Sequence, residues 1–279
     1  MKPTVGIVGI GLIGGSLGQA LRRSGRYRVL GIARRPATLR DAKRRGAVDR
    51  ASTRIEDVAA ADIVVLAMPV AQIVPSLKRL LPFLKPQALV TDVGSVKGRV
   101  LRDIQPLLKG RRITFVGGHP LAGSHKTGVN AARPDLFKGA TCVLVPSVKS
   151  AAKPLIALWK AVGARPVVMS ADAHDAAVAL TSHLPHALAH ALVHAARNRA
   201  GQPVLKSLMA GSFRDVTRVA SADPDQWVQI FAANAPALRR ALAEFRRELD
   251  RIERHIGRAS LTRHLRRSQA YRQPLFYGV

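Results

Sequence analysis

A glycine-rich turn between a short apolar strand and a helix is the feature that most constrains this chain. Residues 5–8 have the pattern of a buried parallel strand, and Gly9-x-Gly11-x-x-Gly14 follows directly, before an amphipathic stretch. This spacing permits a tight turn, a close approach of pyrophosphate to the backbone, and close helix–strand packing. The sequence therefore predicts that a dinucleotide binds here, with its phosphates on N–H groups at a helix N-terminus. The predicted cofactor-binding residues of this turn are Gly9, Gly11, Leu12, Ile13 and Gly14.

Strand and helix patterns then alternate as far as residue 170. Further strands are predicted over residues 28–32, 63–67, 88–91, 114–116, 142–145 and 166–168. This alternation predicts an α/β domain with a Rossmann-type, doubly wound, mostly parallel sheet over residues 1–170. Ligands of such sheets bind beyond the carboxyl ends of the strands. We therefore expect Met68, Pro69 and Asp92 to contribute to the cofactor site, beside the loop at residues 117–124.

Strand patterns stop near residue 171, and helical periodicity takes over. The apolar residues between Leu238 and Ile256 recur at steps of four and three, which makes a narrow seam that needs a partner. We expect residues 171–279 to form an all-α substrate and dimerisation domain, which makes the protein a homodimer. The basic stretch after Arg258 is expected to be a loosely held tail.

Composition limits the remaining classes. The 279 residues include 45 Lys and Arg against 17 Asp and Glu, a net charge of +28 that would attract anionic small molecules or nucleic acid. No nucleic-acid-binding motif accompanies the charge, and no run approaches the ~20 apolar residues of a membrane span. The single cysteine, Cys142, cannot form an internal disulfide and fits a buried structural thiol. We expect a cytoplasmic protein with a dianionic small-molecule substrate and without a specific nucleic-acid or membrane partner.

The end of the second predicted strand bears on the choice of cofactor. An acidic residue at this point would bind the ribose hydroxyls of NAD, but the chain has Ala33, Arg34 and Arg35. Two guanidinium groups without a carboxylate suit a 2′-phosphate. NADP is therefore favoured over NAD, although both arginines could simply belong to the basic surface.

Several further side chains are candidates for chemistry. His119 follows a strand and two glycines, where an imidazole could take a proton or could simply bond to backbone. Arg214 and Arg218 lie one turn apart and could clamp carboxylates, although a surface ion-pair turn is the common alternative. The histidines between His183 and His194 share a helical face, but no carboxylate or cysteine joins them at ligand spacing, so no metal site is expected.

The chain resembles the prephenate/arogenate dehydrogenase family of tyrosine biosynthesis from about Val5 to Ile256. Seven segments in a fixed order carry the resemblance: G-I-G-L-I-G-G-S at 9–16, T-D-V-G-S-V-K at 91–97, G-G-H-P-L-A-G-S at 117–124, H-D at 174–175, S-H-L-P-H at 182–186, F-R-D-V-T-R at 213–218 and D-P-x-x-W at 223–227.

The resemblance implies an oxidative decarboxylation that turns a cyclohexadiene into an aromatic ring. It implies that His119 accepts the proton of the C4 hydroxyl, that Ser95 bonds near it, and that Arg218, with Arg214 beside it, holds a carboxylate. Ser182 and His186 would approach the substrate side chain. The remaining residues that would shape the closed site are His174, Asp175 and Trp227.

Alternative functions remain open at this point. Prephenate and arogenate differ in a keto or an amino group, and an imidazole at His186 that donates to an oxygen favours prephenate. The arogenate reaction with NADP is the alternative within enzymes, and a hydroxyacid dehydrogenase is disfavoured because Lys206, the lysine after Lys160, lies outside a matching motif. A nucleic-acid-binding protein with a degenerate Rossmann domain is the alternative outside them.

Overall fold

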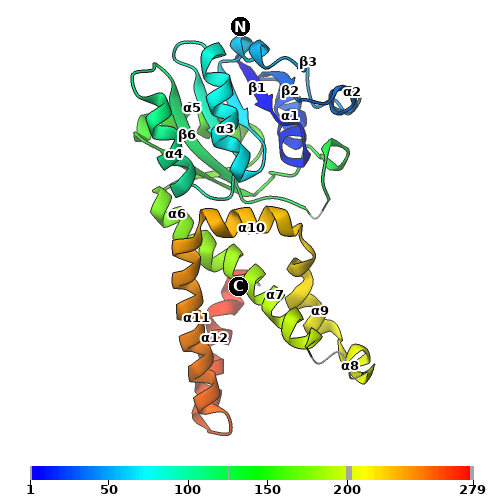
Figure 1. Ribbon diagram of the computed structural model, residues 1–279, viewed down its shortest axis with the longest axis vertical. Coiled ribbons are helices and arrows are strands. Elements are labelled where there is room, and N and C mark those ends of the chain that lie inside the picture. The colour runs from blue at the N-terminus through cyan, green and yellow to red at the C-terminus, as the bar shows by residue number, and fades with distance from the viewer. Residues whose placement is uncertain (1, 125, 199–202, 277–279) are drawn as a thin grey trace.

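A computed structural model describes residues 2–124, 126–198 and 203–276, which form a sheet domain and a helical half (Figure 1). The strands lie in the order β3-β2-β1-β4-β5-β6-β7-β8, and all neighbours are parallel except β6 and β7. The strands are β1 (Thr4–Val8), β2 (Arg28–Ile32), β3 (Arg50–Ser52), β4 (Ile63–Leu66), β5 (Leu89–Asp92), β6 (Thr114–Pro120), β7 (Thr141–Pro146) and β8 (Arg165–Val168). The predicted α/β fold with a mostly parallel sheet followed by helices is confirmed.

Helices cover both faces of the sheet, which explains why the strands are apolar on both sides. One face packs against α1 (Leu12–Ser24), α2 (Pro36–Arg44) and α5 (Lys153–Ala161), whose Trp159 is fully buried. The other face packs against α3 (Val70–Leu80) and α4 (Gly98–Leu108). Short 3-10 segments at η1 (Ile55–Ala60), η2 (Leu81–Phe83), η3 (Val129–Ala131) and η4 (Lys149–Ala152) complete the domain. The thiol of Cys142 is buried in β7, as expected of a structural cysteine, and burial raises its pKa.

Strand β6 is longer than its sequence predicts. The prediction ended it at Val116, whereas the strand continues through Gly117, Gly118 and His119 to Pro120, antiparallel to β7. The two glycines explain the difference, since they allow the neighbouring chain to approach closely. A side chain at Gly118 would lie 2.5 Å from the carbonyl oxygen of Asp92. His119 is therefore held in a paired strand rather than in a loop.

The helical half lies next to the carboxyl edge of the sheet, and α10 lies between the two parts (Figure 1). Its elements are α6 (Ala171–Val178), η5 (Ala179–His183), α7 (Leu184–Arg197), α8 (Pro203–Leu208), α9 (Gly211–Thr217), η6 (Arg218–Ser221), α10 (Pro224–Ala233), α11 (Ala235–His255) and α12 (Ser260–Phe276). A small apolar core joins η5, α7 and α11.

The stretch after Arg258 is a helix rather than a loose tail. Residues 260–276 form α12, which lies beside α11 although most of its side chains are exposed. Its arginines, leucines and glutamines have high helix propensity, so they form a helix without a strong apolar face. The uneven apolar pattern therefore concealed the helix from a periodicity argument.

Helix α6, the π-helical turn η5 and helix α7 run continuously over residues 171–197. By length and composition alone this helix could cross a membrane, since its most apolar stretch has a mean hydropathy of 1.2, and 28% of that stretch is buried. Core helices pass the same test. Here His174, Asp175 and His183 point their polar groups into contacts with other parts of the chain. A π turn in such a position often marks a functional site.

Candidate active site

The glycine turn forms a cradle at the N-terminus of α1. Gly9 has a φ of 97°, and a side chain there would lie 2.4 Å from the carbonyl oxygen of Ala67. A side chain at Gly14 would lie 2.1 Å from the Gly9 oxygen, whereas the space above Gly11 is open. No side chain caps the helix and its first turn contains no acid, so its first N–H groups, at Leu12, Ile13 and Gly14, are available. This cradle fits the pyrophosphate of a dinucleotide.

The end of β2 and the turn after β4 flank this cradle. Ala33 is partly buried and its N–H donates to Ser52, while Arg34 and Arg35 are exposed just before α2. The side chain of Met68 is partly buried and that of Pro69 is exposed, where the chain leaves β4 beside Gly9. The strand ends therefore present two guanidinium groups and no carboxylate where the adenosine ribose would lie.

A buried ion pair supports the loop between β5 and α4. Lys97 and Asp92 are both fully buried, and the Lys97 ammonium bonds to the Asp92 carboxylate and to the carbonyl of Gly118 at 2.8 Å. The carboxylate also accepts N–H groups from Gly94 and Gly118, each at 2.9 Å. The expectation that Asp92 contacts the cofactor therefore needs correction. The Asp92 side chain is fully buried, and its carboxylate accepts hydrogen bonds from Lys97, Gly94 and Gly118 within the protein.

Three side chains connect β6 to the helical half. His119 Nδ1 lies 2.8 Å from His174 Nε2, and His174 Nδ1 lies 2.7 Å from the carboxylate of Asp175. That carboxylate also accepts the N–H groups of Lys97 and Gly98, each at 2.8 Å. Burial alone would raise the pKa of Asp175, but the hydrogen bonds from His174, Lys97 and Gly98 outweigh it and lower the pKa. Asp175 therefore remains a carboxylate, shared between both parts of the protein.

One arrangement of protons satisfies every contact in this chain of hydrogen bonds. In it, His174 Nδ1 donates to the Asp175 carboxylate, and His119 Nδ1 donates to His174 Nε2. Nε2 of His119 then keeps its lone pair. Burial and the positive charge of Lys97 hold the pKa of His119 well below its ordinary value of 6.5. His119 is therefore a neutral imidazole that can accept a proton.

His183 and Asn234 form a second buried contact between helices. The Asn234 amide donates to the backbone oxygen of Asp175 at 2.8 Å and lies 3.2 Å from His183 Nδ1. Burial lowers the pKa of His183 to about 4, although the carboxylate of Asp175 opposes the shift. His183 is therefore neutral in the folded protein, with Nδ1 as the acceptor for the amide.

The His183 pKa predicts a loss of stability in acid. A histidine with a folded pKa of about 4 and an ordinary pKa of 6.5 binds its proton in the unfolded chain first, so stability is highest above pH 6.5 and falls as the pH drops toward 4. The shift corresponds to about 3 kcal/mol. Urea unfolding of the wild type and of His183→Asn between pH 7 and 4 should show a flatter dependence in the variant. His264→Asn in α12 is the control, and an unchanged slope in His183→Asn would refute the linkage.

Side chains expected near the substrate lie around Trp227. It stacks on His186 with ring centroids 3.4 Å apart and meets His183 edge-on at 6.0 Å. Burial lowers the pKa of His186, and the charges of His190 and Arg218 lower it further, although the hydrogen bond to the Ser182 backbone opposes the shift. The turn η6, which begins at Arg218, packs against α7. His186 Nδ1 lies 3.0 Å from the backbone oxygen of Ser182.

The remaining candidates lie at the edges of this arrangement. Ser95 is partly buried in the loop held by Asp92 and Lys97. Helix α9 ends at Thr217, so Arg218 begins a 3-10 turn rather than continuing the helix that carries Arg214. Arg214 is exposed, and within the described part of the chain no hydrogen bond or ion pair links it to the site.

Lys97, His183 and Asn234 were given no role by sequence reasoning. Lys97 stood in the quoted T-D-V-G-S-V-K segment, and a lysine five residues after an acid at a strand end is a signal that it could pair with that acid. His183 stands in a row of histidines on one helical face, which does not single it out, and nothing in the local sequence of Asn234 indicates its contact. Across residues 2–124, 126–198 and 203–276, no group of three or more histidine, cysteine or acidic side chains could hold a metal.

Comparisons with known proteins cover both halves of the chain. The family described as prephenate dehydrogenase, nucleotide-binding domain, matches residues 17–168, and the one described as its dimerization domain matches residues 170–267. A prephenate dehydrogenase of Bacillus subtilis is 36% identical over 286 residues, which cover 99% of this chain and 76% of that protein.

Two solved structures have the same fold over nearly their whole lengths. Prephenate dehydrogenase from A. aeolicus, in complex with hydroxyphenyl propionate and NAD+, is 34% identical with a TM-score of 0.90 and covers 99% of both chains. The arogenate dehydrogenase of Synechocystis is 33% identical with a TM-score of 0.86, over 98% of this chain and 99% of that one.

Proposed function

The chain belongs to the prephenate dehydrogenase family, and we propose that it oxidises prephenate to 4-hydroxyphenylpyruvate with loss of CO2. The observation that carries the proposal is His119, a neutral imidazole at the carboxyl edge of the nucleotide-binding sheet. Its Nδ1 is committed to His174, so Nε2 is the free base. A base at this point is what a hydroxyl needs when the carbon that bears it is oxidised.

The reaction divides into a proton transfer, a hydride transfer and a bond cleavage. When bound, a nicotinamide dinucleotide supplies the hydride acceptor. His119 Nε2 takes the proton of the C4 hydroxyl as C4 loses its own hydrogen as hydride. The electron pair of the bond between C1 and its carboxylate enters the ring as CO2 departs, and the ring becomes aromatic. The oxygen on C4 then regains the proton from His119, which gives the hydroxyl of 4-hydroxyphenylpyruvate and restores the neutral imidazole. The charge that develops on His119 is offset by Asp175 through His174. The protein therefore needs to orient the substrate and remove one proton, since aromatisation supplies driving force.

We propose NADP as the preferred cofactor. Two observations support the preference, namely the exposed guanidinium groups of Arg34 and Arg35 and the absence of a carboxylate at Ala33. The structure of the A. aeolicus relative contains NAD+. The proposed preference for NADP therefore rests on the residues at the end of β2 in this chain.

A four-way assay tests both proposals. Purified protein is mixed with prephenate or arogenate and with NAD+ or NADP+, and formation of reduced cofactor is followed by absorbance. We expect the highest kcat/KM with prephenate and NADP+. Turnover with none of the pairs would refute the enzymatic proposal, and turnover with NAD+ alone would refute the cofactor preference.

Arogenate is the second candidate substrate because of His186. From the sequence alone, this imidazole is expected to donate to a keto oxygen, which favours prephenate. In the structure Nδ1 bonds to the Ser182 carbonyl, and burial together with Arg218 favours the neutral form, which leaves Nε2 as an acceptor. An acceptor suits the ammonium group of arogenate, so the arogenate arms of the assay decide this point.

We propose that Arg218 binds a substrate carboxylate beside His186 and Trp227. Ser182 would lie near the substrate side chain, Ser95 would lie near His119, and Arg214 would contribute positive charge from α9.

Replacing Arg218 by alanine should raise KM for prephenate by about 10- to 100-fold, because a charge-assisted hydrogen bond is lost. The kcat should change little, since the carboxylate is held equally before and during the reaction. Steady-state kinetics test this, with Arg239→Ala on α11 as the control. Loss of kcat at unchanged KM would overturn the role.

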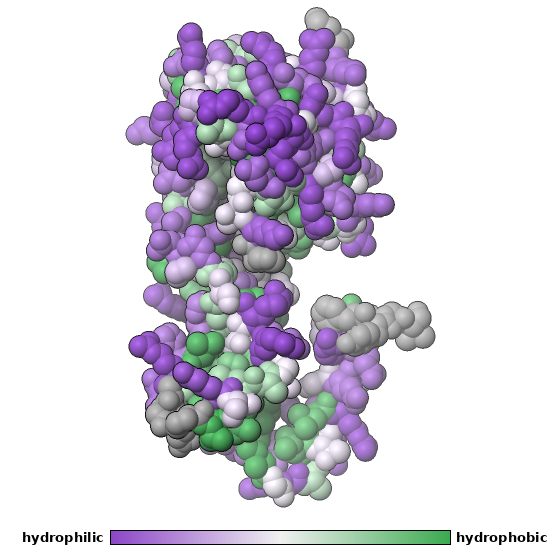
Figure 2. Space-filling view, turned by 90° about the vertical axis from the view of Figure 1, so that its right-hand side faces the viewer, coloured by the Kyte–Doolittle hydropathy of each residue, from purple (hydrophilic) through white to green (hydrophobic). Residues whose placement is uncertain are grey.

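We also propose that two copies pair through their helical halves. Hydrophobic side chains gather on this half, whereas the face of the sheet domain seen in Figure 2 is mostly hydrophilic. Leu180, which is 54% exposed, lines a groove of about 400 Å³ together with Leu184 and Phe245, and the charged residues Glu244, Arg247 and Glu248 form the rest of its lining. The seam of α11 is also exposed at Leu249. A second copy would cover this surface, including the apolar side of helix 171–197.

A further inference from the structure

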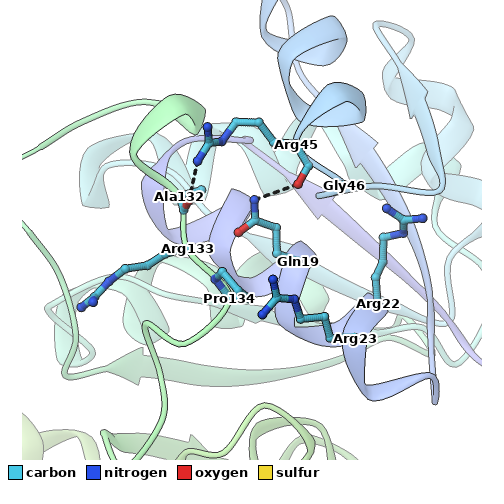
Figure 3. Close-up of a pocket in the computed structure, with 8 residues that line it drawn as sticks. All are labelled: Gln19, Arg22, Arg23, Arg45, Gly46, Ala132, Arg133 and Pro134. Carbon is cyan, nitrogen blue, oxygen red and sulfur yellow. Dashed lines mark hydrogen bonds between the residues drawn. The ribbon is translucent and has the colours of Figure 1, made fainter.

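A second cavity lies on the sheet domain, away from the active site. It is open to solvent, has a volume of about 580 Å³ and is lined by three segments, which are the C-terminal half of α1, the turn after α2 and the stretch after η3 (Figure 3). Its lining residues are Gln19, Arg22, Arg23, Arg45, Gly46, Ala132, Arg133 and Pro134. None of the eight is acidic and four are arginines.

The positive charge of this cavity is only partly neutralised. Arg22 forms an ion pair with Asp49 at 2.6 Å, and Arg133 lies 3.8 Å from Asp135. Arg45 donates to the Ala132 carbonyl at 3.0 Å, a neutral partner. Arg23 forms no ion pair with any residue of the described ranges. The cavity therefore presents at least two guanidinium groups without a neutralising acid, which is the chemistry that binds phosphate or carboxylate.

The walls of the cavity are held by specific hydrogen bonds. Gln19 is 7% exposed and donates through Nε2 to the Arg45 carbonyl at 2.9 Å. Its Oε1 is buried with no hydrogen-bond partner among the described residues. The N–H of Arg133 donates to Ser16 Oγ at 3.0 Å, which ties the third segment to α1. The cavity is thus a built feature of the fold rather than a gap between mobile arginines.

The position of the cavity separates it from the cofactor cradle. Gln19 follows Gly11 by eight residues, and a helix rises 1.5 Å per residue, so the two sites lie about 12 Å apart along α1. A dinucleotide that binds at the N-terminus of α1 extends along the strand ends, whereas the cavity lies at the C-terminal half of the helix.

We propose that this cavity binds a small polyanion that carries at least two phosphate or carboxylate groups. Its volume lies within the range of small-molecule sites, which favours such a ligand over an extended polymer. Two anionic groups match the guanidinium groups of Arg23 and Arg45, and a hydroxyl on the ligand could satisfy Gln19. The ligand would join α1 to the segment after η3.

Isothermal titration calorimetry tests the site with two probes, inorganic pyrophosphate and citrate, which separate a phosphate from a carboxylate source. The protein is first saturated with its nicotinamide dinucleotide, so that the cradle at α1 is occupied. Arg23→Gln/Arg45→Gln removes two charges from the cavity. Lys78→Gln/Arg79→Gln removes two exposed charges from α3 on the opposite face of the sheet and is the matched control.

We expect the cavity variant to weaken binding by about tenfold for each guanidinium removed, and the control variant to bind as the wild type does. The probe that binds more tightly identifies the anionic group. Equal weakening in both variants would mean attraction by the general charge, and no weakening in either would place the anion elsewhere. Both results would overturn the proposal. The single Arg23→Gln variant, at an exposed position, repeats the test if the double variant does not fold.

Discussion

Replacing His119 by asparagine is expected to lower kcat by about 10²- to 10⁴-fold, the usual contribution of a general base. An asparagine amide can still bond to His174, but it has no lone pair basic enough to take the hydroxyl proton. Substrate binding depends on other groups, so KM should stay within about threefold. Steady-state kinetics with the preferred substrate and cofactor measure both constants.

The pH profile distinguishes a lost base from a distorted site. Burial and Lys97 hold the pKa of His119 well below 6.5, so wild-type kcat/KM should be level down to pH 6.5 and fall only in more acidic solution, where the imidazole gains a proton. His119→Asn should lose this acidic limb. His264→Asn in α12 should keep both kcat and the profile. Full kcat in His119→Asn would exclude the base assignment.

Replacing Lys97 by methionine is expected to destabilise the protein by about 3–5 kcal/mol. The substitution leaves the Asp92 carboxylate buried without its counter-ion, and an unpaired buried charge is costly. It also removes the ammonium group that donates to the Gly118 carbonyl, next to His119. Urea denaturation measures the loss as a fall in the transition midpoint at a similar slope.

Two further variants show whether the effect comes from burial of the charge. Arg99→Met removes a cation of the exposed Arg99–Asp103 pair on α4 and should cost no more than about 1 kcal/mol. Asp92→Asn/Lys97→Met removes both buried charges and should recover much of the stability that Lys97→Met loses. A loss in Lys97→Met as small as that in Arg99→Met would contradict the buried-pair explanation.

Local patterns predicted most of the fold. The glycine turn at Gly9–Gly14, the apolar strands and the periodic seam of α11 each depend on neighbours in sequence, so propensity and spacing are sufficient to identify them. The short strand β3 and helix α12 escaped prediction, since three residues carry little periodic signal and α12 has no regular apolar face. The predicted end of β6 was wrong for another reason. Two glycines usually indicate a turn, but here they permit close packing against Asp92.

The sequence by itself predicted the cradle at Gly9 and the basic end of β2 at Arg34 and Arg35, and it offered His119 as a candidate base beside the alternative of a histidine bonded to backbone. Only the tertiary structure decided that His119 is neutral, because its partner His174 is 55 residues away and the shift depends on burial and on Lys97. It also moved Asp92 from the predicted cofactor surface into a buried ion pair, and it brought Asn234 to His183. Protonation and pairing depend on which charges are enclosed together, and that is a property of the packed chain rather than of spacing along it.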